Sequence, residues 1–370
     1  MVYMDNEKPS FKSQSHTGNK NDKINEKIFY KYLNLKIKKD REGNKRIYTI
    51  ENLANNQLHF SDPATFNDPF DCNISVVHIG TREQWLNFYK SIGYNYRKAV
   101  KFFNENLKTK VLIKESDQLY SYDFIKHLKL NIERGLLKKE NHLVYNSSEE
   151  SRKQIGNNMN DYLRTEGLPR VSCFSGTEKN VLMWSHYADH HKGICLKFRS
   201  YPHTFKVNES LEGDFLINIG LVQPNKEYYL LDLYTPTTNK LSTNIFYNIE
   251  YKDEPPEPIN FFNFLGEYKP FFKFLTTKYT DWKYEDEYRL IIDQDILENE
   301  ILNYRKKDLE GVIFGLKINY NNAKLVYDTI KQNYLDKGIN VNFYEAKEVH
   351  HKYEVETEPI INIEKYLDDI

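Results

Sequence analysis

The sequence predicts an α+β fold, in which a central mixed or mostly antiparallel sheet has flanking helices and a helical insertion. Three observations predict it. Short apolar runs typical of strands are scattered along the chain. Segments with apolar residues at helical spacing lie among them, without the regular alternation of strand and helix that builds a doubly wound parallel sheet. A long block at about 82–150 shows helical periodicity throughout.

The expected elements follow from these patterns in chain order. Residues 1–27 are polar and rich in Lys, Asn and Ser, which predicts a disordered tail before a single α+β domain over residues 28–370. Thr49 is expected to cap a short helix, and residues 200–260, which contain several prolines, are expected to be irregular. The expected strands are 28–33, 57–61, 170–175, 193–198, 288–292, 311–315, 341–344 and 353–356, with a helix between 175 and 193 and another over 321–337.

Composition and charge limit the classes of function. The 370 residues are 39% hydrophobic, which is enough for a sizeable core, and the formal net charge is −1. A protein that binds nucleic acid mainly through electrostatics would usually be basic, so this class is not favoured. Aromatic residues make up 15% of the chain. This content fits a genome biased toward A·T-rich codons, although stacking on nucleobases is an alternative explanation.

The cysteines and the apolar runs bear on the compartment. Cys72, Cys173 and Cys195 are too few for a disulfide framework in a chain of this size, and their spacing fits no zinc ribbon or finger. No apolar run approaches the length of a membrane helix, and residues 1–27 contain no signal-peptide core. We therefore expect a cytoplasmic protein with no membrane partner and no bound metal.

Three segments are candidates for a functional site, and the first runs from Phe66 to Asp71. Asn67 and Asp68 stand before a proline, which predicts a tight turn after a strand. Such a turn could present Asn67, Asp68 or Asp71 into a cleft. A purely structural turn, closed by an Asx cap, is the alternative.

The second candidate segment runs from Trp184 to Gly193. His186 and His190 are four residues apart, so on a helix they would share a face and could hold a metal. No third ligand is evident. The alternative is a helix end for which Gly193 provides the C-cap.

The third and most specific segment runs from Trp282 to Arg289. In an extended stretch, Glu285, Glu287 and Arg289 would point in the same direction. A strand face that carries two carboxylates and an arginine is costly to bury without a function. A solvated edge strand or an internal ladder of ion pairs is the alternative.

The set of segments resembles a bacterial family known as domain of unknown function 2971. The resemblance covers about residues 28–350 and rests on several linked motifs in the same order. These motifs are 29–32, 58–61, 66–71, 172–175, 183–188, 191–196, 282–290 and 312–315. The family name supplies no reaction. The resemblance implies a cytoplasmic bacterial protein, and for some members a role in defence against phage.

A further similarity connects the chain with the NAD-dependent ADP-ribosyltransferases. Ser172 and Ser175 stand near the end of an expected strand, and Glu285 and Glu287 form an E-x-E pair. In that superfamily, the same parts cleave the bond between nicotinamide and ribose. The similarity implies that Glu287 is the catalytic carboxylate, since a carboxylate stabilises the positive charge that builds on the sugar. Glu285 would be its helper, which orients the acceptor.

The same similarity implies NAD as the substrate and a macromolecular acceptor, either a nucleic acid or a protein. The first strand of that superfamily carries an Arg or a His, where this chain has Tyr30 and Lys31. The residues that would line the NAD site are Tyr30, Lys31, Asn67, Asp68, Ser172, Ser175, Trp184, His186, Tyr187 and Arg289.

Two other classes of function stay open at this point. A metal-dependent hydrolase or nuclease could bind Mg²⁺ or Mn²⁺ through the carboxylates of Asp68, Asp71, Glu285 and Glu287. A non-catalytic sensing or interaction protein of a defence system could use the helical insertion as its partner surface.

Overall fold

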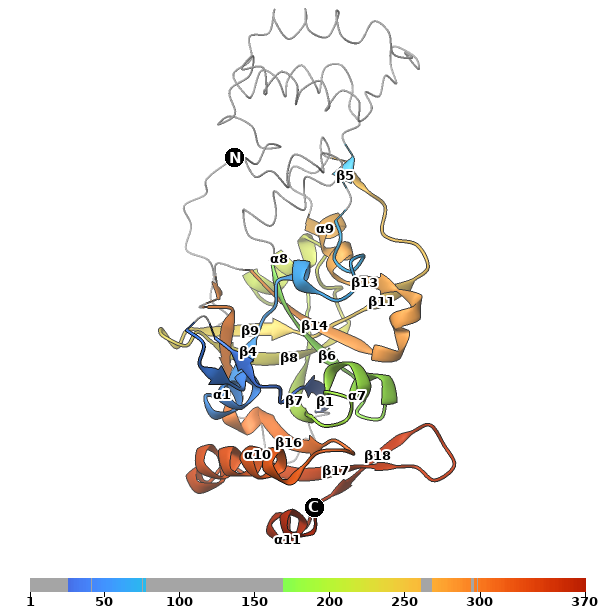
Figure 1. The fold of residues 1–370 in the computed structure, drawn as a ribbon. Helices are drawn as coiled ribbons and strands as arrows, with labels where there is room; N and C mark the ends of the chain where they lie inside the picture. The colour runs from blue at the N-terminus through green and yellow to red at the C-terminus, as the bar shows by residue number, and fades with distance from the viewer. Residues whose placement is uncertain are drawn as a thin grey trace, which may run out of the picture. The chain divides into compact units, whose positions relative to one another are not determined.

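The chain forms two compact units in a computed structural model (Figure 1). The first unit comprises Met1–Asn67, Pro169–Asp253 and Lys278–Ile370, and the second comprises Asp68–Leu168 and Glu254–Thr277. The structure describes residues 26–40, 42–74, 76–77, 169–260, 268–293, 296–297 and 299–370. The expected tail up to residue 25 and the expected helical insertion at about 82–150 lie outside these ranges.

A twelve-stranded sheet organises the first unit. Its strands are β1 (Lys27–Leu33), β4 (Gln57–His59), β6 (Arg170–Ser175), β7 (Ile194–Thr204), β8 (Glu227–Tyr234), β9 (Leu241–Ile245), β10 (Tyr247–Asn248), β14 (Glu287–Ile292), β15 (Ile301–Tyr304), β16 (Leu309–Phe314), β17 (Asn342–Glu348) and β18 (Val355–Pro359). The main path of neighbours is β10-β14-β6-β1-β7-β16-β17-β18, and β8 branches from β7 toward β9, β15 and β4. Within the described part of the chain, β16 and β17 are the parallel pair of an otherwise antiparallel sheet.

Helices and small hairpins complete the first unit. The α-helices are α1 (Tyr48–Ala54), α7 (Val181–Tyr187), α8 (Leu211–Asn218), α10 (Tyr320–Asn333) and α11 (Ile363–Asp369). The 3-10 turns are η1 (Pro63–Thr65), η4 (Thr280–Glu285), η6 (Lys306–Asp308) and η7 (Leu335–Lys337). The small paired strands are β2 (Lys38–Lys39) with β3 (Lys45–Arg46), and β11 (Glu250–Lys252) with β13 (Thr277–Tyr279). The predicted α+β class with a mostly antiparallel sheet is confirmed.

The described part of the second unit is small. It contains β5 (Val76–Val77), which pairs in parallel with β12 (Ile259–Asn260), and the helix α9 (Tyr268–Leu275). Phe271, Phe274 and Leu275 of α9 are buried, because they fall at helical spacing on one face.

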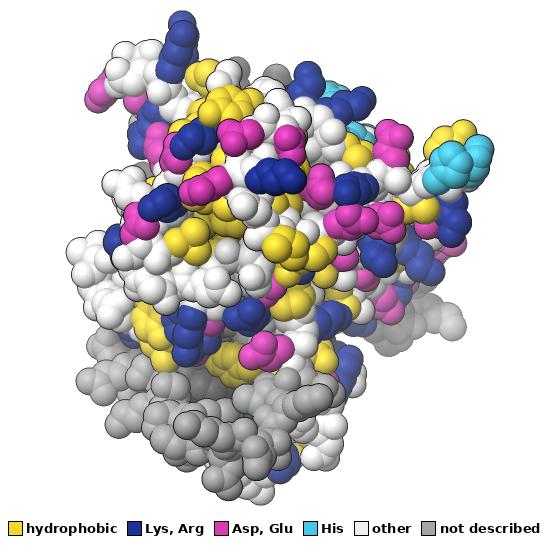
Figure 2. All heavy atoms as spheres, turned by 90° about the horizontal axis from the view of Figure 1, so that it is seen from below, with side chains coloured by type: hydrophobic (Ala, Val, Ile, Leu, Met, Phe, Trp, Pro, Cys, Tyr) yellow, Lys and Arg dark blue, Asp and Glu magenta, His cyan; other side chains and the backbone are white. Residues whose placement is uncertain are grey.

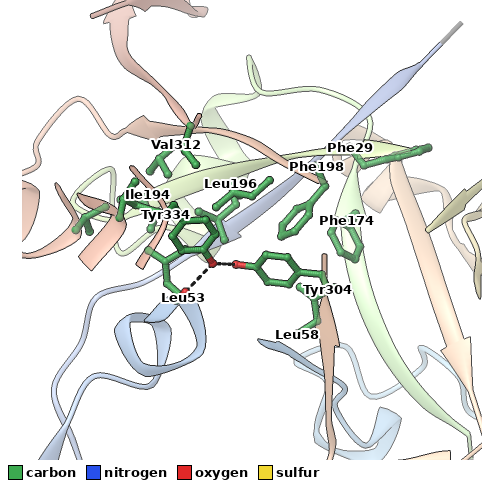
Figure 3. Packing of buried hydrophobic residues seen from close by; sticks show 14 of the residues in the cluster. Phe29, Leu53, Leu58, Phe174, Ile194, Leu196, Phe198, Tyr304, Val312 and Tyr334 are labelled. Atoms are coloured by element: carbon green, nitrogen blue, oxygen red, sulfur yellow. Dashed lines mark hydrogen bonds between the residues drawn. The ribbon is translucent and has the colours of Figure 1, made fainter. Parts of the chain in front are cut away.

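The main hydrophobic core lies on one face of the large sheet (Figure 3). Phe174 on β6 meets Phe198 on β7 edge to face, with ring centroids 5.7 Å apart. Two buried tyrosines of this core are joined by a hydrogen bond. The hydroxyls of Tyr304 and Tyr334 are 2.7 Å apart, and Tyr334 also donates to the carbonyl oxygen of Leu53 at 2.7 Å.

The helix α7 packs against part of the opposite face of the sheet. Trp184 is fully buried there, and its ring meets that of Tyr32 on β1 edge to face at 5.1 Å. The side chain of Asn180 caps the helix by accepting from the backbone N–H groups of Leu182 and Met183. This face also carries the candidate site.

Three expectations about secondary structure were wrong. Thr49 does not cap α1, because the helix begins at Tyr48 and the Thr49 hydroxyl donates to the carbonyl of Asn34 instead. Residues 200–260 are not irregular, since Pro224 and Pro236 flank β8 rather than interrupt it. The helix expected over 321–337 ends at residue 333, and a 3-10 turn follows.

Surface charges are mixed rather than segregated on the side of the molecule where α10 and α11 lie. Figure 2 shows basic and acidic side chains interspersed over that face. Examples of ion pairs that involve α10 are Lys324 with Asp328 and Lys331 with Asp336. Among the described residues, no helix is long and apolar enough to cross a bilayer.

Candidate active site

A change of backbone conformation brings Glu285 and Glu287 together. The turn η4 ends at Glu285, Asp286 has a left-handed backbone with φ of 43°, and β14 begins at Glu287. The expectation that Glu285 alternates with Glu287 and Arg289 along one strand was therefore wrong. Gly176 makes room for this turn, because a Cβ atom there would collide with the carboxylate of Asp286.

Lys278 holds both carboxylates. Its Nζ lies 2.5 Å from Oε2 of Glu285 and 3.0 Å from Oε2 of Glu287, so these oxygens are at most 5.5 Å apart, the sum of the two distances. Arg289 donates to both oxygens of Glu287, from Nε at 2.6 Å and from Nη2 at 3.1 Å. All four side chains are buried, and Arg289 has no exposed surface. Two positive charges thus balance two negative charges away from water.

The two carboxyl groups have pKa values displaced in opposite directions. Burial raises the pKa of Glu285, and the charge of Glu287 adds to this effect against the opposing charge of Lys278. Burial acts in the same sense on Glu287, but the charges of Arg289 and Lys278 outweigh it and hold its pKa well below the usual range. Environments that push the pKa values of neighbouring carboxyls apart are typical of acid–base pairs in active sites.

Aromatic and amide side chains surround this pair. The hydroxyl of Tyr187 on α7 donates to Oε1 of Glu285 at 2.6 Å, and the side chain of Asn67 lies close enough to act on the pKa of the same hydroxyl. The guanidinium carbon of Arg289 lies 5.5 Å from the ring centroid of Phe66. Burial and the charge of Glu285 raise the pKa of Tyr187, so this phenol stays protonated. Two expected site residues, Asn67 and Tyr187, therefore lie beside Glu285.

The strand register places a row of polar side chains next to the carboxylates. Glu287 on β14 is paired with Ser175 on β6, and Ser175 is paired with Tyr30 on β1. Directly paired residues on neighbouring strands point to the same face of a sheet, so these three side chains share one face. The strands β14, β6 and β1 lie side by side (Figure 1). Ser175 also donates to the backbone oxygen of Glu285 at 2.7 Å.

Lys31 and Ser172 lie on the other face of the sheet. The Nζ of Lys31 donates to Oγ of Ser172 at 2.8 Å and lies 4.6 Å from the ring centroid of Phe174, which belongs to the main core. Burial lowers the pKa of Lys31 to about 8. The structure therefore does not bring Lys31 and Ser172 together with Glu287.

The second candidate segment is mainly structural. Trp184 is buried under α7, and its Nε1 donates to the carbonyl of Glu178 at 2.8 Å. His186 is exposed on α7, with its ring 6.3 Å from that of Tyr284. The expectation that His186 and His190 share a helix face was wrong, because the helix ends at Tyr187 and His190 has a left-handed backbone with φ of 54°.

The capping role expected of Gly193 was also wrong. The C-cap residue of α7 is Ala188, five residues earlier in the chain. Gly193 has a different use, since a Cβ atom there would collide with the carbonyl oxygen of Leu33. The glycine therefore allows the start of β7 to approach the end of β1 closely.

Asp68 belongs to the second unit and forms the expected turn. Its Oδ1 accepts from the backbone N–H of Phe70 at 2.9 Å, which is an Asx turn. Asp68 and Asp71 are both buried. Within the described ranges, no group of three or more His, Cys, Asp or Glu side chains is placed to hold a metal ion.

Lys278 is the site residue that the sequence motifs did not indicate. It stands seven residues before Glu285, on a short strand outside the acidic motif. One signal could have indicated it, since two buried carboxylates and one arginine leave a net negative charge that needs another cation. Tyr251 was missed in the same way, and its hydroxyl accepts from the backbone N–H of Glu287 at 2.8 Å.

Residues 183–290 match the family described as a protein of unknown function (DUF2971). This segment contains Tyr187, Lys278, Glu285, Glu287 and Arg289. No curated protein and no solved structure matches the chain. The resemblance expected from the motifs is confirmed over residues 183–290, where the chain matches the model of the DUF2971 family.

Proposed function

We propose that the protein is a cytoplasmic transferase that cleaves the nicotinamide–ribose bond of NAD and passes ADP-ribose to a macromolecular acceptor. One observation carries the proposal. Glu285 and Glu287 are buried together with pKa values displaced in opposite directions, and the sheet register places Ser175 and Tyr30 beside Glu287 on the same face.

Glu287 would act as the ionised carboxylate at the reacting sugar. Arg289 and Lys278 hold its pKa down, so it carries its charge at neutral pH. When the bond between ribose C1′ and the nicotinamide nitrogen breaks, the electron pair leaves with nicotinamide, which departs as a neutral molecule. Positive charge builds on the sugar, and a fixed carboxylate stabilises it.

Glu285 would act as the base toward the acceptor. Its raised pKa makes it a stronger base than an ordinary glutamate, and Tyr187 fixes its orientation through the hydrogen bond to Oε1. The acceptor oxygen or nitrogen forms the new bond to C1′, and its proton passes to the Glu285 carboxylate. Because both carboxylates bind the same Nζ of Lys278, the two steps would occur within one small site.

The energetics of burial support a functional explanation of the cluster. Removing two ion pairs from water costs several kcal/mol per ion, and well-packed apolar residues usually stabilise a fold as well or better. Strongly displaced pKa values in a buried group of this kind are more frequent at functional sites than elsewhere.

The hydroxyl of Tyr30 is the candidate for binding the ribose or the nicotinamide amide, and Ser175, whose hydroxyl donates to the backbone oxygen of Glu285, would brace the site. Tyr30 is only partly buried. Lys31 and Ser172 are not part of the proposed site, because they lie on the other face of the sheet. The acceptor would be a nucleic acid or a protein, and a role in defence against phage belongs to the same proposal.

Release of nicotinamide from labelled NAD tests this function. The purified protein would be incubated with NAD alone, with nucleic acid, and with cell lysate. We expect release by the wild type, a loss of at least a hundredfold for Glu287→Gln, and a smaller loss for Glu285→Gln. Glu358→Gln, on the exposed strand β18, is the matched control. Circular dichroism and thermal unfolding would show that each variant is folded.

Two results would contradict the proposal. The first is no release by the wild type under any of the three conditions. The second is equal release by the wild type and a folded Glu287→Gln variant. Mg²⁺ binding measured by calorimetry, if lost in that variant, would favour the metal-dependent hydrolase instead.

A further inference from the structure

The polar row beside the carboxylates continues across the sheet to a second charged group. Tyr30 on β1 is paired with Lys197 on β7, and Lys197 is paired with Gly311 on β16. Lys197 therefore points to the same face as Glu287. Its strand position lies three strand spacings from that of Glu287, which is about 14 Å at roughly 4.8 Å per spacing.

Lys197 forms a compact cluster with Glu310 and Tyr344. Its Nζ lies 3.2 Å from Oε2 of Glu310 and 3.8 Å from the ring centroid of Tyr344. The other carboxylate oxygen, Oε1, accepts from Nδ2 of Asn342 at 2.9 Å and from the hydroxyl of Tyr344 at 2.8 Å. The carboxylate is thus fixed in position by side chains from β7 and β17.

One oxygen of Glu310 keeps unused capacity as a hydrogen-bond acceptor. Oε2 is buried and paired with the Nζ of Lys197 at 3.2 Å, and no second donor reaches it among the described residues. Burial alone would raise the pKa of Glu310, yet the hydrogen bonds from Asn342 and Tyr344 and the charge of Lys197 lower it. The group is therefore an ionised acceptor, and most buried carboxylate oxygens have hydrogen-bond partners.

Gly311 lets the tyrosine lie close to the sheet. A Cβ atom at this position would be 2.8 Å from the ring of Tyr344 and 2.8 Å from the carbonyl oxygen of Asn342. Any larger residue would push Tyr344 away and separate its hydroxyl from Glu310.

We infer that Lys197 and Glu310 form the subsite for the adenosine diphosphate half of the dinucleotide. This inference rests on the proposed function. An ammonium group is a suitable partner for a phosphate, and a fixed carboxylate oxygen is a suitable acceptor for a ribose hydroxyl. The distance of about 14 Å between the strand positions of Glu287 and Lys197 suits a dinucleotide. Its reacting ribose would lie at Glu287, and its second nucleoside would lie near Glu310. Tyr344 is a positioning residue that orients both charged groups.

Binding of two non-reacting probes by calorimetry tests the subsite. ADP-ribose carries the phosphates and both riboses, whereas adenosine carries one ribose and no phosphate. We expect Lys197→Met to weaken binding of ADP-ribose at least tenfold and to leave adenosine nearly unchanged. Glu310→Gln should weaken the binding of both probes. Tyr344→Phe should weaken the binding of both probes too, but by less. Lys347→Met, which removes an exposed lysine paired with Glu358, is the control.

The outcomes separate this inference from the proposed function. Equal binding of ADP-ribose to the wild type and to a folded Lys197→Met variant would overturn the subsite, as would no binding to the wild type. Binding that depends on Lys197, in a protein that releases no nicotinamide, would support the subsite and contradict the transferase. For an active enzyme, Lys197→Met should raise KM for NAD and leave kcat unchanged.

Discussion

Replacing Lys278 with methionine tests whether the carboxylates depend on the ammonium group that they share. Without it, two buried carboxylates face each other with oxygens at most 5.5 Å apart, while Arg289 remains paired with Glu287 alone. Two unit charges at that distance repel by at least about 3 kcal/mol at an effective dielectric constant of about 20, and the charge of Lys278 offsets this repulsion in the wild type. This energy corresponds to about two pKa units, so the raised pKa of Glu285 would move further toward neutrality.

The stability of Lys278→Met should therefore depend on pH. At pH 7.5 we expect a loss of about 3 to 5 kcal/mol in the free energy of unfolding, because a buried ionic group has lost its partner. The pKa of Glu285 is higher in the folded than in the unfolded state. Protonated Glu285 therefore contributes its full stabilisation of the fold at pH values below its pKa in the unfolded state. This contribution is lost as the pH rises through its pKa in the folded state. The variant should lose clearly less stability at pH 5 than at pH 7.5.

Urea unfolding at the two pH values measures this effect. The double variant Lys278→Met with Glu285→Gln should regain about 2 to 3 kcal/mol at pH 7.5, because it carries one buried carboxylate fewer. Lys283→Met, which removes an exposed lysine of the same 3-10 turn, is the control. An equal loss at both pH values, together with no gain in the double variant, would refute the reasoning.

Three other substitutions test separate features of the first unit. Lys31→Met should stabilise the fold by at most about 3 kcal/mol at pH 7, and the gain should fade toward pH 10, because a lysine whose pKa falls to about 8 on folding destabilises while it is protonated. Urea unfolding across this range checks it, and a constant gain would contradict it. Tyr334→Phe should lose about 1 to 3 kcal/mol in the same assay, since the buried hydroxyl of Tyr304 loses its partner and the carbonyl of Leu53 keeps only the backbone N–H of Asn56 at 3.3 Å. Gly176→Ala should lower nicotinamide release at least tenfold, because its methyl group displaces Asp286; full activity in the folded variant would show that this turn does not set the geometry.

Much of the sheet could be predicted because its strands carry local signals. The strand β6 spans the expected residues 170–175, and β14 differs from expectation by one residue at its start. Runs of β-branched and aromatic residues bounded by turn residues were sufficient there. Thr49 shows the limit of such signals. Threonine favours helix N-caps, but the hydroxyl of Thr49 donates to the carbonyl of Asn34 instead.

The face on which each candidate side chain lies could not be predicted. Tyr30 and Lys31 are adjacent, so a shift of one residue in the strand pairing exchanges their faces. The pairing with Ser175 decides the matter, and that residue lies more than 100 positions further along the chain. Glu285 shows a second limit, because the left-handed residue that follows it breaks the period of two on which the expectation depended.

The row of Tyr30, Ser175 and Glu287 also determines when the candidate site can form while the ribosome synthesises the chain. Its three strands are each more than 100 residues apart in the chain, so their pairing needs the closure of long loops and is slow compared with local structure. A nascent chain that has not yet reached residue 287 can pair β1 with β6 but holds no carboxylate at the end of the row. Under the proposed function, NAD cleavage would therefore begin only after the last third of the chain has folded.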